Sequence, residues 1–554
     1  GRPAPGPPAR AARAPPQARR GLRGPRGLTA GMATDDKYDR QLRLWGAHGQ
    51  KALMDSQICV LGSSAIATET LKNLVLPGIG RFTVVDSAKV EAADLGHNFY
   101  LEEGDLGKSR AEAVTKWLQE NNPDVQGGHV ERDAASAIGE GKEFFRPFSL
   151  VVACQLAEGL SVQLCNFCKE LDIPLLLLTS LGFVGKLRVY VAEHCVCETK
   201  PDSEFGDLRL TDPFPELQRF ASSVNIESLD IAGHAHVPYV VILIQALDIF
   251  RKEHEGKQLP TSSEDKQAFK KIILRMQRSD QEKNFAEAFE NAYKAWVPYS
   301  IPEPVQRMLE LKTADGKSDF WIVARAVSQF VRDCGKLPLT GALPDMTAGT
   351  DTFVKLQELY NSRADGDCAA ITAHVATIQK ELGVTAPISP EYVKRFCQNA
   401  PYCEVFGFRT LEDELRPCSP EDGGLDLADE CADEDSLIRW YLALRAADRF
   451  REERGHWPGS LCGDGEAALA GETAALTQVA AKIVESYKAE GAAADPKALE
   501  EVVRYGGSEL HVTSSVMGGV AAQEVVKLLT KQYSPLCNTL IYDGLHGKMQ
   551  TLEL

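Results

Sequence analysis

The stretch from Ile58 to Asp86 limits the possible fold more than any other part of this chain. An apolar run reaches Gly62, a helical pattern covers Ala65–Val75, and a second apolar run ends at Asp86. A strand, a helix and a strand, with an acid about two dozen residues after the first glycine, are typical of dinucleotide-binding units. The stretch therefore predicts a Rossmann-like α/β domain.

The turn after the first expected strand is poor in glycine. Gly62 is followed by Ser63, Ser64, Ala65 and, two positions on, Ala67. A phosphate-binding loop needs several glycines, because a Cβ keeps the backbone N–H groups away from the phosphates. The sequence therefore predicts a nucleotide-type fold without its nucleotide loop.

Strand and helix patterns alternate from Gln57 to about Arg209, which predicts a doubly wound α/β domain. The expected strands are 58–61, 82–85, 150–154, 174–179, 186–192 and 539–543, and the expected helices include 65–75, 108–121 and 160–171. A helical pattern dominates from Asp212 to Leu499, and the α/β pattern returns near Arg504. We therefore expect a disordered Arg/Pro/Gly-rich leader (1–35), an α/β domain in two parts (36–209 and 504–554), and an all-helical insertion between them (210–503).

Composition narrows the classes of partner. The 554 residues carry a formal net charge of −17, which disfavours a nucleic-acid partner. No apolar run is long enough for a transmembrane segment, and the 14 Cys lie scattered through apolar segments, as in proteins of a reducing compartment. These features predict a cytoplasmic protein, with the nucleus or the periphery of membranes as further locations.

The segment Asp36–Gly46 is compact and unusual. Arg40 and Arg43 lie three residues apart on one helical face, and Leu42, Leu44 and Trp45 could anchor that helix. The segment can be interpreted as an amphipathic helix that docks on the core, or as a helix whose Arg side chains reach an anion. From these residues alone the docking interpretation is favoured, because most surface Arg are merely solvated.

No convincing metal or nucleophile site appears. Cys165 and Cys168 are spaced within one helix, and Cys195 and Cys197 are too close together for a zinc-binding pair, so buried thiols are expected. The segment His234–His236 offers two imidazoles without a third ligand and is expected to be a surface loop. The sequence therefore predicts no metal site.

Several motifs together resemble the ubiquitin-activating enzyme family. They are Tyr38-Asp-Arg-Gln-Leu-Arg-Leu-Trp-Gly, the Gly62 turn, Val-Val-Asp86, Asp105-Leu-Gly-Lys-Ser-Arg110 and Gly518-Gly-Val-Ala-Ala-Gln-Glu-Val-Val-Lys. They lie in the two α/β parts, and the resemblance implies an adenylation domain of the ThiF/MoeB type. The first motif is that of the family's non-catalytic halves.

The resemblance also implies that this adenylation domain is inactive. The ribose acid is retained as Asp86, and the glycine loop is reduced to Gly62. His97 stands at the family's Arg position and Arg110 at its Lys position. Where the magnesium Asp should follow the strand at 150–154, the chain has Gln-Leu, and the family's catalytic Cys-Thr signature is absent. The residues Gly62, Asp86, His97 and Arg110 are expected to form a degenerate nucleotide pocket.

The resemblance implies a function for a chain that is not an enzyme by itself. We expect a regulatory subunit of a heterodimeric activating enzyme, in the branch that serves the ubiquitin-like modifier of cullins and the cell cycle. The expected partners are the catalytic subunit, as an obligate heterodimer, the modifier, and the tail of the amyloid precursor protein. ATP and Mg²⁺ are expected on the catalytic subunit and no cofactor on this chain. Arg40 is expected to contact that ATP in trans, with Arg43 as the second choice.

Three alternatives remain open at this point. The chain could serve another ubiquitin-like modifier, it could be an autonomous adenylyltransferase that relies on Asp86, or it could be an adaptor whose helical block binds other proteins. The adaptor leaves the Arg40 motif unexplained.

Overall fold

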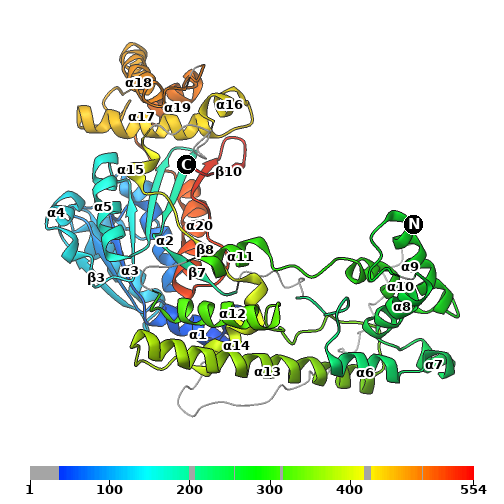
Figure 1. Cartoon of the computed structure of the whole chain (residues 1–554). Helices are drawn as coiled ribbons and strands as arrows, with labels where there is room; N and C mark the ends of the chain where they lie inside the picture. The colour runs from blue at the N-terminus through cyan, green and yellow to red at the C-terminus, as the bar shows by residue number, and fades with distance from the viewer. Residues whose placement is uncertain are drawn as a thin grey trace, which may run out of the picture.

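The computed structural model describes residues 36–198, 206–254, 256–311, 316–416, 426–463, 465–489 and 491–554 (Figure 1). The predicted leader, residues 1–35, lies outside this range.

A mixed eight-stranded sheet organises the α/β part, in the order β10-β9-β6-β5-β4-β1-β2-β3. Strands β3, β2, β1, β4 and β5 are parallel, whereas β6, β9 and β10 continue the sheet in antiparallel fashion. The strands are β1 (Gln57–Leu61), β2 (Arg81–Val85), β3 (Gln126–Val130), β4 (Leu150–Cys154), β5 (Leu175–Leu181), β6 (Val184–Tyr190), β9 (Thr539–Asp543) and β10 (Lys548–Leu552). Since β9 and β10 come from the end of the chain, the two expected α/β parts share one sheet.

The expected strands are confirmed, but β3 and β10 were not predicted. Both lie at an edge of the sheet, where one face or more remains exposed. Their sequences, Gln-Gly-Gly-His-Val and Lys-Met-Gln-Thr-Leu, therefore lack the apolar run that identifies a central strand.

Helices cover both faces of the sheet because side chains along a strand alternate between its faces. Ile58 and Val60 of β1 pack into a core beneath α2 (Ala65–Val75), α3 (Arg110–Asn121) and α20 (His511–Thr530). Cys59 and Leu61 point to the other face, which α4 (Ala134–Gly139) and α5 (Glu158–Leu171) cover. Helix α1 (Asp39–Met54) packs against α20.

Gly518 allows α20 to lie directly on α2. A Cβ at this position would stand 2.8 Å from Glu69 Cβ and 2.8 Å from the backbone nitrogen of Thr70. Gly518 thus permits a close contact between two helices that are distant in sequence.

The helical segment forms three groups, each with its own core. The first is α6 (Pro215–Ser223), α7 (Ile231–His234), α8 (Tyr239–Glu253), α9 (Ser263–Met276) and α10 (Lys283–Glu290). The second is α11 (Glu303–Glu310), α12 (Asp319–Cys334), α13 (Thr350–Leu382) and α14 (Pro390–Asn399). The third is α16 (Leu427–Ala432), α17 (Ile438–Arg454), α18 (Glu466–Ser486) and α19 (Pro496–Tyr505), preceded by α15 (Leu411–Glu414).

Two features connect these groups to the rest of the molecule. The long helix α13 contributes Tyr360 to the first core and Ile371 to the second, and it runs from beneath the sheet to α6 in Figure 1. Strand β8 (Glu404–Phe406) lies inside the predicted insertion and pairs with β7 (His194–Val196). In its described residues the insertion is therefore helical apart from β8, a strand too short to show a pattern of its own. No helix in the described ranges is both long and apolar enough to cross a membrane.

Candidate functional site

Helix α1 docks on the core through Trp45 and Gln50. Trp45 Nε1 donates to Gln50 Oε1 at 3.0 Å, and Gln50 Nε2 donates to the carbonyl oxygen of Pro77 at 2.9 Å. Gln532 Nε2, just beyond α20, donates to the Trp45 carbonyl oxygen at 3.0 Å. A kink at Gly46, where φ is 67°, separates the motif from the rest of the helix. The docking interpretation is therefore correct for Trp45.

The two arginines of the motif differ in what they contact. Arg43 Nη2 forms an ion pair with Asp39 Oδ2 at 2.8 Å. Arg40 is exposed, and within the described part of the chain its side chain has no hydrogen bond or ion pair. Among the described residues, the Arg40 guanidinium thus has no partner, and its helix is fixed to the core through Trp45 and Gln50.

A cluster of polar side chains lies at the carboxyl ends of β1, β2 and β4, where the nucleotide pocket was predicted. Gly62 has a φ of +92°, and a Cβ there would stand 3.2 Å from the Cys154 carbonyl oxygen, so a glycine is required. Ser63 follows, and both its backbone N–H and its hydroxyl donate to Asp86 Oδ2, at 3.0 and 2.5 Å.

The predicted ribose acid, Asp86, is fully engaged within the chain. Arg110 Nη2 lies 2.9 Å from Asp86 Oδ2, and Arg110 Nη1 reaches Asp94 Oδ1 at 2.9 Å. Burial acts to raise the pKa of Asp86, but the charge of Arg110 and the Ser63 hydrogen bond outweigh it and lower that pKa. Arg110 is therefore a counter-ion for Asp86 and Asp94 within the chain.

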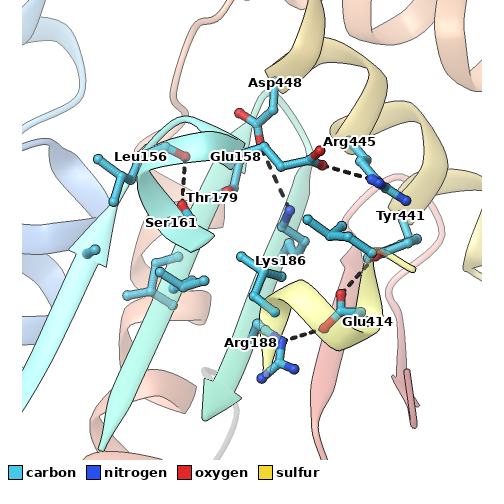
Figure 2. Close-up of a pocket in the computed structure, with 15 residues that line it drawn as sticks. Leu156, Glu158, Ser161, Thr179, Lys186, Arg188, Glu414, Tyr441, Arg445 and Asp448 are labelled. Carbon is cyan, nitrogen blue, oxygen red and sulfur yellow. Dashed lines mark hydrogen bonds and ion pairs between the residues drawn. The ribbon is translucent and has the colours of Figure 1, made fainter. Parts of the chain in front are cut away.

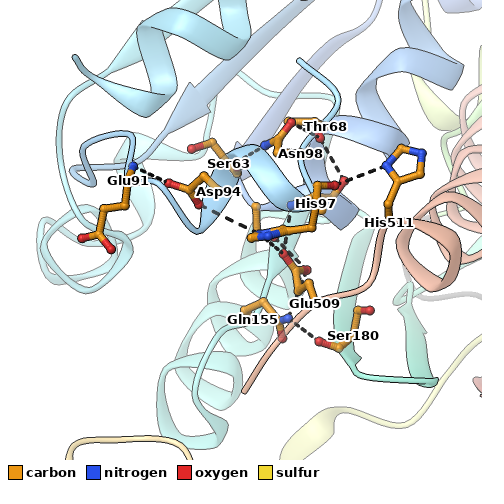
Figure 3. A network of polar contacts seen from close by, with 12 residues as sticks. Ser63, Thr68, Glu91, Asp94, His97, Asn98, Gln155, Ser180, Glu509 and His511 are labelled. Atoms are coloured by element: carbon orange, nitrogen blue, oxygen red, sulfur yellow. Dashed lines mark hydrogen bonds and ion pairs between the residues drawn. The ribbon is translucent and has the colours of Figure 1, made fainter. Parts of the chain in front are cut away.

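A residue that the sequence analysis did not single out, Glu509, occupies the other half of the pocket (Figure 3). Its carboxylate accepts from the Ala65 N–H at 2.9 Å, from Ser64 Oγ at 3.2 Å and from Gln155 Nε2 at 3.1 Å. His97 Nε2 stands 3.9 Å from it. Burial raises the pKa of Glu509, although the hydrogen bond from Ala65 and the nearby His97 oppose that effect.

The structure therefore places Gly62, Asp86, His97 and Arg110 in one cluster, to which it adds Glu509. Gln155 follows β4 directly, and its amide donates to Glu509 and to the Ser180 carbonyl oxygen. ATP and Mg²⁺ do not fit these residues, because the acids are bound by the chain's own donors and a carboxylate lies at the start of α2.

A second polar cluster lies between the sheet and α17 (Figure 2). Arg188 of β6 donates to Glu414 of α15, which also accepts from the Tyr441 hydroxyl at 2.7 Å. Arg445 Nε donates to Glu158 Oε2 at 2.8 Å. These buried charges join the third helical group to the sheet. The sequence contained no signal for them, since each partner lies on a different element.

The remaining candidates are structural. Cys165 and Cys168 are buried, and burial raises the pKa of both thiols, as expected for unreactive cysteines. His234 is not in a surface loop, which corrects that expectation: it is 1% exposed and its Nδ1 lies 2.6 Å from Glu282. Among the described residues, the one group spaced for a metal is the exposed set Glu112, His129 and Glu131.

Comparison with known proteins decides the family, since residues 38–554 match the ThiF family. The chain belongs to the ThiF family. The expected α/β fold, interrupted by a helical segment, is thereby confirmed.

Relatives of this ThiF chain match it over nearly its full length. It is 37% identical over 524 residues to the NEDD8-activating enzyme E1 regulatory subunit AXL of Arabidopsis thaliana, covering 94% of this chain and 99% of that protein. It is 36% identical over 534 residues to the NEDD8-activating enzyme E1 regulatory subunit of Danio rerio, covering 94% and 98%. Among solved structures, E. coli MccB with AMPCPP matches 29% of this chain and 49% of its own, at 16% identity and a TM-score of 0.26, which supports no comparison of sites.

Proposed function

We propose that this ThiF chain is the regulatory subunit of a NEDD8-activating enzyme E1. It pairs with a catalytic subunit, and the catalytic subunit holds ATP and Mg²⁺ while the C-terminus of the modifier is adenylated. The observation that carries this proposal is that Asp86, Arg110 and Glu509 fill the predicted nucleotide pocket with contacts inside the chain. Relatives with the regulatory-subunit name, at 36–37% identity over 94% of the chain, support it.

An autonomous adenylyltransferase is the less favoured alternative. Its one firm support in the sequence was Asp86, and the Asp86 carboxylate already accepts from Ser63, Ala88 and Arg110. A ribose would have to displace a buried ion pair, which is costly because it leaves Arg110 without its main counter-ion.

Arg40 is the residue of this chain that we assign to the partner's ATP. A guanidinium is charged at all physiological pH values and can bind a phosphate through two N–H groups. Arg40 is exposed and free among the described residues, whereas Arg43 is held by Asp39 at 2.8 Å. The fixed docking of Trp45 and Gln50 gives Arg40 a defined position at the surface.

We expect Arg40→Ala to reduce kcat/KM for ATP in the reconstituted heterodimer by at least about tenfold, the value of one lost charge-assisted hydrogen bond. The measurement is NEDD8-dependent ATP–pyrophosphate exchange over a range of ATP concentrations. Arg43→Ala is the matched control, because it removes the same charge three residues away and should change kcat/KM by less than about threefold. An Arg40→Ala heterodimer with unchanged ATP kinetics would refute the assignment.

A further inference from the structure

The carboxylate of Glu509 lies where nucleotide-binding folds place a phosphate. In such folds the phosphate sits at the N-terminus of the helix that follows the first strand, where unpaired N–H groups and the helix dipole attract an anion. Here that helix is α2, its first residue is Ala65, and the Ala65 N–H donates to Glu509 Oε2 at 2.9 Å. The position is therefore filled by an anion that belongs to the chain.

The environment of this carboxylate has the composition of an anion site. The Ser64 hydroxyl and the Gln155 amide donate to Glu509 Oε1 at 3.2 and 3.1 Å, and His97 Nε2 lies 3.9 Å from Oε2. Every one of these groups is a donor or a potential cation, and the Glu509 side chain is only 7% exposed. The donors of a phosphate site thus remain, although the glycine loop does not.

The backbone holds Glu509 firmly in this place. Gly182, the residue after β5, donates its N–H to the Ser508 carbonyl oxygen at 2.8 Å, and Glu509 forms a parallel bridge with Gly182. His511 Nδ1, two residues on, lies 3.2 Å from the His97 carbonyl oxygen. The segment between α19 and α20 is therefore attached to both sides of the pocket.

We propose that this pocket is an anion site kept filled by the chain's own Glu509, and that it takes a phosphate-class anion only when that carboxylate is removed. The pocket binds no nucleotide because it is occupied and because Asp86 is neutralised by Arg110, not because its donors are gone. This anion site lies within the chain itself and involves neither the partner subunit nor Arg40.

The test uses the full chain and inorganic pyrophosphate, with binding measured by isothermal titration calorimetry. We expect Glu509→Ala to bind pyrophosphate at least about tenfold more tightly than the wild type. Without the Glu509 carboxylate, the donors at Ser64, Ala65 and Gln155 are free to bind the added anion. Glu500→Ala is the matched control, since it removes an exposed carboxylate of α19 with the same change in net charge. Adenosine should bind neither to the wild type nor to Glu509→Ala or Glu500→Ala, because Asp86 still accepts from Arg110 and Ser63 in all of them.

Circular dichroism shows whether each variant is folded. If Glu509→Ala does not fold, Glu509→Gln replaces it: the amide keeps the shape and still accepts from Ala65, but it lacks the charge, so a smaller gain in pyrophosphate affinity is expected. A folded Glu509→Ala or Glu509→Gln protein that binds pyrophosphate no better than Glu500→Ala overturns the proposal. Adenosine binding to Glu509→Ala would overturn its second part, that Asp86 is neutralised.

Discussion

Replacing Glu414 by Ala is expected to lower the free energy of unfolding by about 3–5 kcal/mol, the cost of leaving one charge of a buried pair alone. The Arg188 and Glu414 side chains are 2% and 3% exposed. Glu414 also accepts from the Tyr441 hydroxyl at 2.7 Å, so the substitution leaves two buried donors without their acceptor (Figure 2). Because these groups lie on β6, α15 and α17, the loss should loosen the third helical group from the sheet.

Urea denaturation followed by far-ultraviolet circular dichroism measures this effect. Glu412→Ala is the matched control: Glu412 lies in the same short helix, it is 45% exposed, and its partner Arg416 is also at the surface. Its removal should change stability by no more than about 0.5 kcal/mol. A Glu414→Ala protein as stable as Glu412→Ala would mean that Arg188 finds another counter-ion, and the account of this interface would be wrong.

Gly518→Ala is expected to lower the free energy of unfolding by about 1–3 kcal/mol, although alanine favours helices. The new Cβ would stand 2.8 Å from Glu69 Cβ and from the Thr70 nitrogen, and 2.9 Å from the Glu69 carbonyl carbon. Two of these atoms are backbone, so α2 and α20 must move apart. That movement would disturb the start of α2 and therefore the pocket around Glu509.

The next residue supplies the control for this substitution. A Cβ at Gly519 would meet nothing within 4 Å, so Gly519→Ala should raise stability by up to about 1 kcal/mol through helix propensity alone. Thermal unfolding of the two variants should therefore show shifts of opposite sign. Two shifts in the same direction would contradict the close packing of α2 on α20.

The central strands of the sheet could be predicted because they are buried on both faces. Ile58–Leu61 and Leu150–Cys154 are continuous apolar runs, and the structure shows them as neighbours in β1 and β4. The edge strands β3 and β10 are half exposed and carry polar residues, with glycines in β3, so a pattern of apolar residues does not reveal them. Strands β7 and β8 were missed for another reason, because three residues are too few to show a pattern.

The candidate site was predictable only in part. Gly62 and Asp86 belong to one local unit, whose spacing is visible in the sequence, and the positions of His97 and Arg110 followed from a resemblance of motifs. Glu509 could not be found in this way, because 445 residues separate it from Ser64 and no local pattern marks its carboxylate as a ligand of α2. Long-range contacts of this kind depend on how α20 packs, which the sequence alone does not show.

The most direct test of the proposed function is NEDD8-dependent ATP–pyrophosphate exchange, measured with the full chain alone, with a catalytic subunit alone and with both together. A chain whose nucleotide pocket is filled by Glu509 and Arg110 should show no exchange by itself, and the mixture should exceed the catalytic subunit alone. Exchange by the isolated chain at a rate comparable to that of the mixture would contradict the proposal that it is a regulatory subunit.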